Sequence, residues 1–266
     1  MSDAFTIVRT APPEEIALRP LEAVAHARIL AFCPTYRIEP ETVQALIAQE
    51  WEGCYDVTFG RDNPFSVSDG GRNNITWQYS RARVAAIDGG YDGLFIVESD
   101  VIPPLDALKR LAVLPSDIAY GEYLFRRTYR VSDWDPNIEL YNSSVFRYVI
   151  GPDPDESLSL HADEWGETYG RATRCTGGGL GCVLVWRQVF KEIHFSYSET
   201  SHCDTMFTKA VHKAGFTMMA DRSVKCGHKM PDGDILYPVS MPGYARKVTG
   251  ILDGYRGELK DDPTKQ

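Results

Sequence analysis

The sequence predicts an α/β protein with a mostly parallel sheet flanked by helices, and three observations support this prediction. Short apolar runs alternate with amphipathic segments through the first half of the chain. Two successive strand, helix, strand units imply parallel strands joined by right-handed crossovers. The 266 residues are 43% hydrophobic and 24% charged, as in ordinary folded proteins. We expect a single domain over 1–266 with its core at 27–229.

The first strand, helix, strand unit covers residues 27–59. The apolar run 27–33 predicts a buried strand, which Pro34 ends. Helical periodicity over 41–50 and strand-like alternation over 55–59 complete the unit. Ligands bind beyond the carboxyl ends of strands in parallel sheets, so the residues after each strand are site candidates.

The later elements are predicted in the same way. A helical pattern over 74–87 ends at Gly89-Gly90, and the apolar run 94–97 is the third buried strand. Further expected elements are a helix at 105–114, a strand at 117–125, a strand or buried edge at 181–187, a helix at 204–214 and a strand at 217–220. We expect 126–171 to be an irregular insertion or lid and 242–266 to be a polar tail.

Charge and composition limit the classes of partner and compartment. Twenty-eight Lys and Arg against thirty-seven Asp and Glu give a net charge of −9, which argues mildly against nucleic acid as partner. The six cysteines form no CxxC pair, which fits reduced thiols. No apolar stretch reaches the roughly 18 residues of a membrane span, and the first residues do not look like a signal peptide. We therefore expect a cytoplasmic protein without a membrane partner.

The strongest motif is Glu98-Ser99-Asp100, at the end of the third predicted strand and before Pro103-Pro104. Two carboxylates separated by one residue lie on the same side of an extended chain, so both can reach one hard cation. Mg²⁺ and Mn²⁺ favour such oxygen ligands and complete their shell with phosphate oxygens. A solvated acidic turn is the alternative.

Three further patterns are candidates for the same site. His228 follows a short apolar strand and can supply a nitrogen ligand, or can be an ordinary surface histidine. The loop 177–181 contains four glycines and suits close approach to a ligand, or a structural turn. Asp204 begins a predicted helix, either as its cap or as a general base. For the acceptor we expect contacts with Gly178, Gly179 and Leu180.

The serial order of these motifs resembles the nucleotide-sugar glycosyltransferases of the GT-A fold, in particular the glycosyltransferase family 2-like group. The resemblance extends over residues 27–229 and implies a GT-A type, Rossmann-like sheet. It implies a metal-dependent enzyme that moves a sugar from a UDP- or GDP-sugar to a hydroxyl acceptor, with inversion. The acceptor classes are a glycan, a small molecule, a protein or a modified base of phage DNA.

The resemblance also implies roles for individual residues. Glu98 and Asp100 stand in the DxD motif, with Asp100 as direct ligand of Mn²⁺ or Mg²⁺ and His228 completing the metal site. The residues implied for the donor are Pro34, Thr35 and Tyr36 at the base and ribose, Asp62 at the base, Arg81 at the diphosphate, and Glu98 with Ser99. Asp204 corresponds to the base that deprotonates the acceptor.

The chain departs from the family pattern at two positions. Glu98 replaces the first aspartate of the motif, and its longer side chain reaches the ribose or a metal-bound water as an alternative to the cation. Cys203 precedes Asp204 where a second acid is usual, so Asp204 acts alone or Glu199 or His202 shares its role.

Other functions stay open on the sequence. A nucleotidyltransferase would need an early loop rich in glycine and arginine, which the sequence after the first strand does not provide. A non-catalytic module that binds a nucleotide or sugar is the alternative from another class. For a DNA acceptor, the basic and aromatic cluster at 126–130 is the candidate contact.

Overall fold

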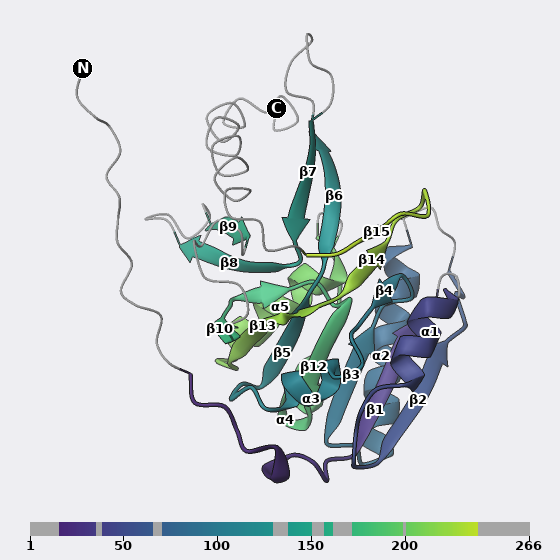
Figure 1. Ribbon diagram of the computed structural model, residues 1–266, viewed down its shortest axis with the longest axis vertical. Coiled ribbons are helices and arrows are strands. Elements are labelled where there is room, and N and C mark those ends of the chain that lie inside the picture. The colour runs from purple at the N-terminus through teal and green to yellow at the C-terminus, as the bar shows by residue number, and fades with distance from the viewer. Residues whose placement is uncertain are drawn as a thin grey trace, which may run out of the picture.

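A seven-stranded sheet forms the centre of the computed structural model, in the order β10-β13-β5-β12-β3-β1-β2 (Figure 1). The structure describes residues 16–35, 39–65, 71–129, 138–150, 157–161, 172–198 and 201–238. The strands of this sheet are β1 (Ile29–Pro34), β2 (Tyr55–Gly60), β3 (Gly93–Val97), β5 (Ile118–Glu122), β10 (Ala172–Arg174), β12 (Cys182–Trp186) and β13 (Met218–Lys225).

The sheet is mostly parallel. β1 pairs in parallel with β2 and β3, and β5 pairs in parallel with β13. β12 runs antiparallel to both β3 and β5, and β10 runs antiparallel to β13. Since β12 is antiparallel to both β3 and β5, those two strands run in the same direction. The parallel strands of the sheet therefore all point the same way: β1, β2, β3, β5 and β13. The predicted class, an α/β fold with a mostly parallel, Rossmann-like sheet, is confirmed.

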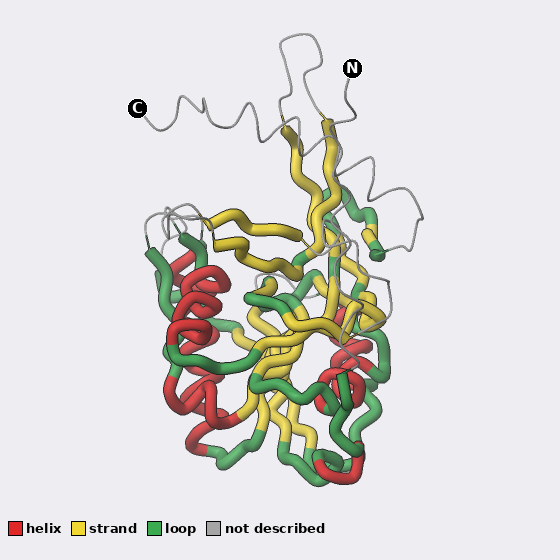
Figure 2. Tube along the Cα trace, turned by 90° about the vertical axis from the view of Figure 1, so that its left-hand side faces the viewer, coloured by secondary structure: helices red, strands yellow, loops and turns green. Residues whose placement is uncertain are grey.

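Helices cover both faces of the sheet (Figure 2). The helices α2 (Arg72–Asp88), α4 (Arg187–Glu192) and α5 (Cys203–Lys213) pack on one face, and α1 (Pro40–Ile47) and α3 (Ala107–Ala112) pack on the other. A short 3₁₀ helix, η1 (Leu21–Ala23), precedes β1. Among the described residues, no helix combines the length and the apolar character that crossing a bilayer requires.

The two faces of the sheet carry separate hydrophobic clusters. Successive strand residues point to opposite faces, so Phe32 and Ile96 pack under α2 while Ala31 and Phe95 pack under α1 and α3. Every residue of β1, β3 and β12 is buried, which explains their continuous apolar runs. The position of β12 between β3 and β5 shows that 181–187 is a central strand and not an edge.

Smaller sheets stand at the carboxyl edge of the main sheet. β14 (Gly227–Lys229) pairs with β4 (Val101–Ile102) and β15 (Ile235–Leu236). β6 (Leu124–Tyr129) and β7 (Ile138–Ser143) form a hairpin that extends away from the core (Figures 1 and 2). β8 (Val145–Ile150) pairs with β9 (Ser157–His161) and with β11 (Gly177–Gly178).

These strands correct the expectation that 126–171 is irregular. Its polar and proline-rich composition obscured the strand-forming residues of Ile138–Ser143 and Val145–Ile150, which pair in sheets. A lid role for this segment stays a prediction, and the predicted tail 242–266 lies outside the described residues. The helix α4 was not predicted, because six residues give too short a pattern.

Candidate functional site

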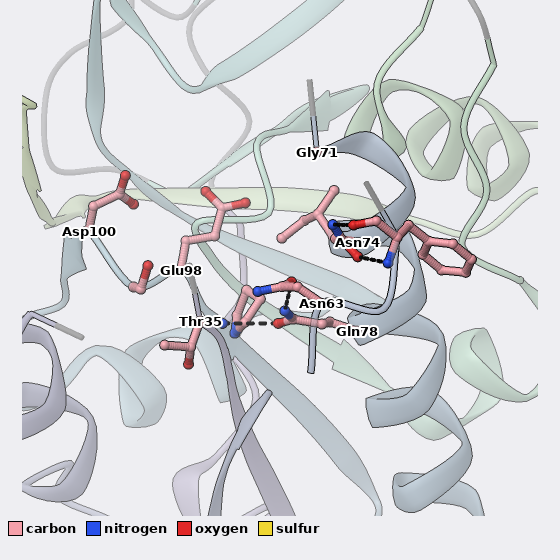
Figure 3. Close-up of a pocket in the computed structure, with 11 residues that line it drawn as sticks. Thr35, Asn63, Gly71, Asn74, Gln78, Glu98 and Asp100 are labelled. Atoms are coloured by element: carbon pink, nitrogen blue, oxygen red, sulfur yellow. Dashed lines mark hydrogen bonds between the residues drawn. The ribbon is translucent and has the colours of Figure 1, made fainter. Parts of the chain in front are cut away.

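A cavity of about 620 Å³ lies beyond the carboxyl ends of β1, β2 and β3, against the first turns of α2 (Figure 3). The residues that line it are Pro34, Thr35, Asn63, Phe65, Gly71, Asn74, Ile75, Gln78, Glu98, Ser99 and Asp100. Parallel strands bring these sequence-distant residues to one edge, as the sequence predicted for Pro34, Thr35, Glu98, Ser99 and Asp100.

Gln78 on α2 joins the loops that follow β1 and β2. Its Oε1 accepts a hydrogen bond from the backbone N–H of Thr35 at 2.9 Å, and its Nε2 donates to Asn63 Oδ1 at 2.7 Å (Figure 3). The side chain is buried, and its amide pairs with the backbone of the buried Thr35 and with the side chain of the exposed Asn63. Sequence reasoning did not identify Gln78, because a polar residue on a helix is usually exposed.

Asn74, one turn before Gln78, holds the loop after β2. Its Oδ1 accepts from the backbone N–H of Phe65 and its Nδ2 donates to the carbonyl of Phe65, both at 2.9 Å. The spacing of four residues places both amides on one face of α2. The helix therefore fixes the backbone on two sides of the cavity.

Glu98 leaves β3 at the cavity and is held by a tyrosine. The hydroxyl of Tyr79, which is buried on α2, donates to Glu98 Oε1 at 2.6 Å. Withdrawal from water raises the pKa of Glu98 to about 7, and the charges of Asp100 and Asp204 act in the same direction, against the lowering effect of the Tyr79 hydrogen bond. Three carboxylates thus interact at this edge.

Asp100 and His228 are brought together by the pairing of β4 with β14. His228 pairs with Val101, and the backbone N–H of Lys229 donates to the carbonyl of Asp100 at 2.7 Å. His228 Nε2 lies 3.7 Å from Asp100 Oδ2. Burial lowers the pKa of His228, but hydrogen bonds to Asp100 and to the carbonyl of Leu124 outweigh it, so the pKa is raised.

The second nitrogen of His228 has a separate partner. Nδ1 lies 2.6 Å from the carbonyl oxygen of Leu124, an atom that only accepts hydrogen bonds. A proton on Nδ1 therefore makes this bond, and in the neutral ring the lone pair of Nε2 faces Asp100. Backbone carbonyls orient metal-binding histidines in this manner.

Asp100 and His228 are close enough to be ligands of one divalent cation. Two ligand atoms that are each roughly 2.1 Å from one ion lie at most about 4.2 Å apart. The 3.7 Å between Asp100 Oδ2 and His228 Nε2 is within this limit. Within the described part of the chain, no group of three or more His, Cys, Asp or Glu side chains is arranged to hold a metal, so Glu98 does not complete a three-residue set in this geometry.

Asp204 lies in the first turn of α5, whose N-cap position is His202. The side chain is half-buried, and its Oδ1 accepts from the backbone N–H of Thr205 at 2.7 Å. Asp204 is close enough to Glu98 to affect it electrostatically. The N-cap position that the sequence offered to Asp204 belongs to His202.

The glycine-rich loop is shaped by tyrosine packing. A Cβ on Gly178 would lie 2.7 Å from the ring of Tyr120, and one on Gly179 would overlap the hydroxyl of Tyr123. Leu180 is 1% exposed and belongs to the hydrophobic core. The glycines admit aromatic rings, and acceptor contacts by Gly178, Gly179 and Leu180 stay a prediction.

Two predicted donor residues bind each other at the surface. Arg81 Nη1 lies 3.2 Å from Asp62 Oδ2, with the side chains 63% and 68% exposed. The Arg81 guanidinium also lies 4.9 Å from the centre of the Trp77 ring. Neither residue lines the described cavity, whereas their neighbours Asn63 and Gln78 do. Two further predicted residues, Tyr36 and Glu199, lie outside the described residues.

No protein-family model matches the chain, and no curated protein matches it. The crystal structure of A197 from STIV is 18% identical, with a TM-score of 0.47, over 80% of this chain and 95% of that chain.

Two further solved structures share 10% identity with the chain. A structure of GalNAc-T7 with UDP, GalNAc and Mn²⁺ has a TM-score of 0.44. The match covers 76% of this chain and 44% of that chain. The inositol-1-phosphate CTP transferase from T. maritima has a TM-score of 0.32, over 74% of this chain and 85% of that chain.

Proposed function

We propose that the chain is a metal-dependent glycosyltransferase that moves a sugar from a nucleotide-diphosphate sugar to a hydroxyl acceptor. The observation that carries the proposal is the pair Asp100 and His228 beside the cavity, with Nε2 of the histidine facing the carboxylate. The donor is a UDP- or GDP-sugar, and the cation is Mn²⁺ or Mg²⁺.

Asp100 and His228 would hold the cation. When bound, a divalent cation stabilises the negative charge that grows on the departing diphosphate. The strand pairing and the Leu124 carbonyl set the positions of the two ligands before the donor arrives, which lowers the cost of reorganisation during the reaction.

Asp204 is the proposed base. The acceptor hydroxyl oxygen forms a bond to the anomeric carbon, the bond from that carbon to the diphosphate breaks, and the hydroxyl proton passes to Asp204. Asp100 and Asp204 come from different parts of the chain, since Asp204 lies on α5 and Asp100 lies between β3 and β4. One carboxylate can therefore hold the cation while the other takes the proton. Attack from the face opposite the diphosphate inverts the anomeric centre.

The proposal is tested with Asp100→Ala. Either UDP or GDP, with Mn²⁺, is expected to raise the thermal midpoint of the wild-type protein by about 2–8 °C, because a ligand at 100 times its Kd stabilises the folded state by about 2.7 kcal/mol. The variant is expected to lose the metal-dependent part of this shift. Asp88→Ala, an exposed carboxylate at the end of α2, is the matched control and is expected to behave as wild type.

Assays for released nucleoside diphosphate then separate an enzyme from a binding module. A transferase releases UDP or GDP from a matching nucleotide sugar, whereas a module binds without turnover. An Asp100→Ala protein that keeps full metal-dependent binding and transfer would contradict the proposal.

A further inference from the structure

Lys229 follows His228 on β14 and makes contacts in two directions. Its backbone N–H donates to the carbonyl of Asp100 at 2.7 Å, so its main chain touches one member of the proposed metal pair. Its side chain reaches the start of α1, where Nζ lies 2.6 Å from Glu39 Oε2 and 3.2 Å from Glu41 Oε2. One residue therefore connects the strand that carries His228 to the helix that follows β1.

The ion pair between Lys229 and Glu39 is largely buried. These two side chains are 20% and 10% exposed, whereas that of Glu41 is 47% exposed. A carboxylate withdrawn from water to this degree needs a positive charge close by, and the ammonium group of Lys229 supplies one at hydrogen-bonding distance. Water and salt screen such a contact less than an ion pair on the open surface.

The position of β14 against β4 sets the separation of Asp100 from His228. The ladder between these strands is short, since β14 has three residues and β4 has two. On its other side β4 packs against α1, the helix to which Lys229 is anchored. The side chain of Lys229 therefore ties β14 to the same support as β4 and adds to the few hydrogen bonds of the ladder.

We propose that Lys229, anchored by Glu39, is a positioning residue for the metal pair Asp100 and His228. The inference rests on the proposed function and adds the means by which this chain holds the two ligands together before a cation arrives. Residues that fix metal ligands from outside commonly contribute roughly tenfold to a hundredfold to metal affinity. Lys229 acts through its neighbours, because an ammonium group has no lone pair for a cation.

Charge and position predict opposite results for Lys229→Met. By charge alone, removal of a positive group beside a cation site strengthens cation binding. Loss of the anchor weakens binding, because the two ligands are no longer held in place. Binding of Mn²⁺ alone is measured by electron paramagnetic resonance of the free ion. We expect the Mn²⁺ Kd to rise roughly tenfold in Lys229→Met and to stay close to wild type in Lys229→Arg, which keeps a cation able to bind carboxylates.

A double variant separates the anchor from the effect of a buried charge. Lys229→Met removes the ammonium group from the buried Glu39 carboxylate, which lowers stability. Lys229→Met combined with Glu39→Gln removes both charges, so we expect urea unfolding to show recovered stability. Its Mn²⁺ affinity is expected to remain roughly tenfold below wild type, because the anchor is still missing.

Hydrogen exchange in the metal-free protein gives a readout that does not depend on binding. In Glu39→Gln, the amide of Lys229 is expected to exchange severalfold faster, relative to the amides of β3, than it does in wild type. The reason is that β14 separates more often from β4 once the anchor is lost. An unchanged ratio would show that the side chain does not hold the strand.

Lys109→Met is the matched control. Lys109 also lies between two glutamates, with Nζ 3.9 Å from Glu50 Oε2 and 3.7 Å from Glu52 Oε1, and its side chain is 28% exposed. Its ion pairs join α3 to the segment after α1 and not to β14. Its replacement is expected to leave Mn²⁺ affinity unchanged.

The outcomes distinguish the inference from the proposed function. If wild type binds no Mn²⁺, or if Asp100→Ala binds it equally well, the proposed metal pair fails and the inference fails with it. If Asp100→Ala loses Mn²⁺ and the folded double variant binds it as tightly as wild type, the proposed function stands and the positioning role of Lys229 is wrong. Tighter binding by Lys229→Met, or equal weakening in Lys109→Met, would likewise overturn that role.

Discussion

Glu98 is a carboxyl group on which burial, a hydrogen bond and neighbouring charges act together. The side chain sits between the buried hydroxyl of Tyr79 and the charges of Asp100 and Asp204. Burial favours the neutral acid, whereas the Tyr79 hydroxyl favours the carboxylate. The Tyr79 hydrogen bond fixes Oε1 of Glu98. Because the carboxyl group is planar and rigid, this bond also restricts the position of Oε2.

Tyr79→Phe is expected to disturb the site more than the fold. The variant loses one hydrogen bond to a carboxyl group, which costs about 1–2 kcal/mol of stability. Because Glu98 loses its anchor at the cavity, we expect the donor KM to rise severalfold in steady-state transfer assays. Tyr120→Phe is the control, since the hydroxyl of this buried tyrosine faces Met218 Sδ at 3.9 Å and not Glu98.

Unchanged donor kinetics in Tyr79→Phe, together with lowered stability in urea, would show that Tyr79 has only a structural role. A change of the same size in Tyr120→Phe would indicate a general effect of removing a core hydroxyl.

The sequence singled out charged residues at this edge of the sheet and missed the neutral ones beside them. Glu98, Asp100 and His228 stood out because charged or titratable residues followed apolar strands. Asn74, Gln78 and Tyr79 lie within a helix, where their buried side is defined only by the strands beneath it. Their roles depend on contacts with residues 9 to 43 positions away in the chain.

At the level of elements, the loop before β12 illustrates two explanations for glycine. The sequence left a choice between ligand approach and a structural turn, and the structure supplies a packing reason at each of three glycines. A side chain on Gly181 would lie 2.7 Å from the ring of Tyr123, the same tyrosine that meets Gly179. Tyr123 directly follows β5, and its ring packs against the backbone of the loop at Gly179 and Gly181.

Gly179→Ala is expected to destabilise the protein by about 1–3 kcal/mol, because the added methyl group overlaps the Tyr123 hydroxyl. The same substitution in a Tyr123→Phe background is expected to cost less, since the overlapping atom is absent. Urea unfolding of the four proteins gives the coupling energy, which we expect to exceed about 0.5 kcal/mol in the direction of rescue.

A Tyr120→Phe background provides the control for this cycle, because Tyr120 meets Gly178 and not Gly179 among the nearest contacts. Additive effects in the Tyr123 pair would contradict the packing explanation for Gly179.

At the scale of the whole molecule, the carboxylate of Asp117 connects segments at the end of the sheet opposite the cavity. Asp117 precedes β5 and accepts hydrogen bonds from Gln188 of α4 at 3.0 Å and from the backbone N–H and hydroxyl of Thr217, both at 2.7 Å. Partial burial alone would raise the pKa of Asp117, but these hydrogen bonds outweigh it and the pKa is lowered. Asp117 thus joins three segments far from the site.

The lowered pKa gives Asp117 a definite effect on stability against pH. The unfolded state has the higher pKa, about 3.9, and takes up the proton first as the pH falls. The stabilisation is therefore complete above that value and is lost as the pH falls through the folded-state pKa. We expect Asp117→Asn to be less stable than wild type at about pH 7, with a difference that shrinks below about pH 4 in urea unfolding.

Glu192→Gln, an exposed carboxylate on α4, is the control for general charge effects. A difference between wild type and Asp117→Asn that stays constant down to about pH 2 would contradict the assigned role of Asp117.

The sequence by itself determined the α/β class, the order of the first strands and helices, and the acidic residues that follow β3. These follow from short-range patterns, since a buried parallel strand is uniformly apolar and a helix repeats every 3.6 residues. Only the tertiary structure decided that β12 is central, that Asp62 and Arg81 face each other instead of the cavity, and that α2 supplies the cavity wall. The pairing of β4 with β14, which sets Asp100 beside His228, joins residues more than a hundred positions apart. Such contacts arise from the packing of whole elements, and no local pattern in the chain encodes them.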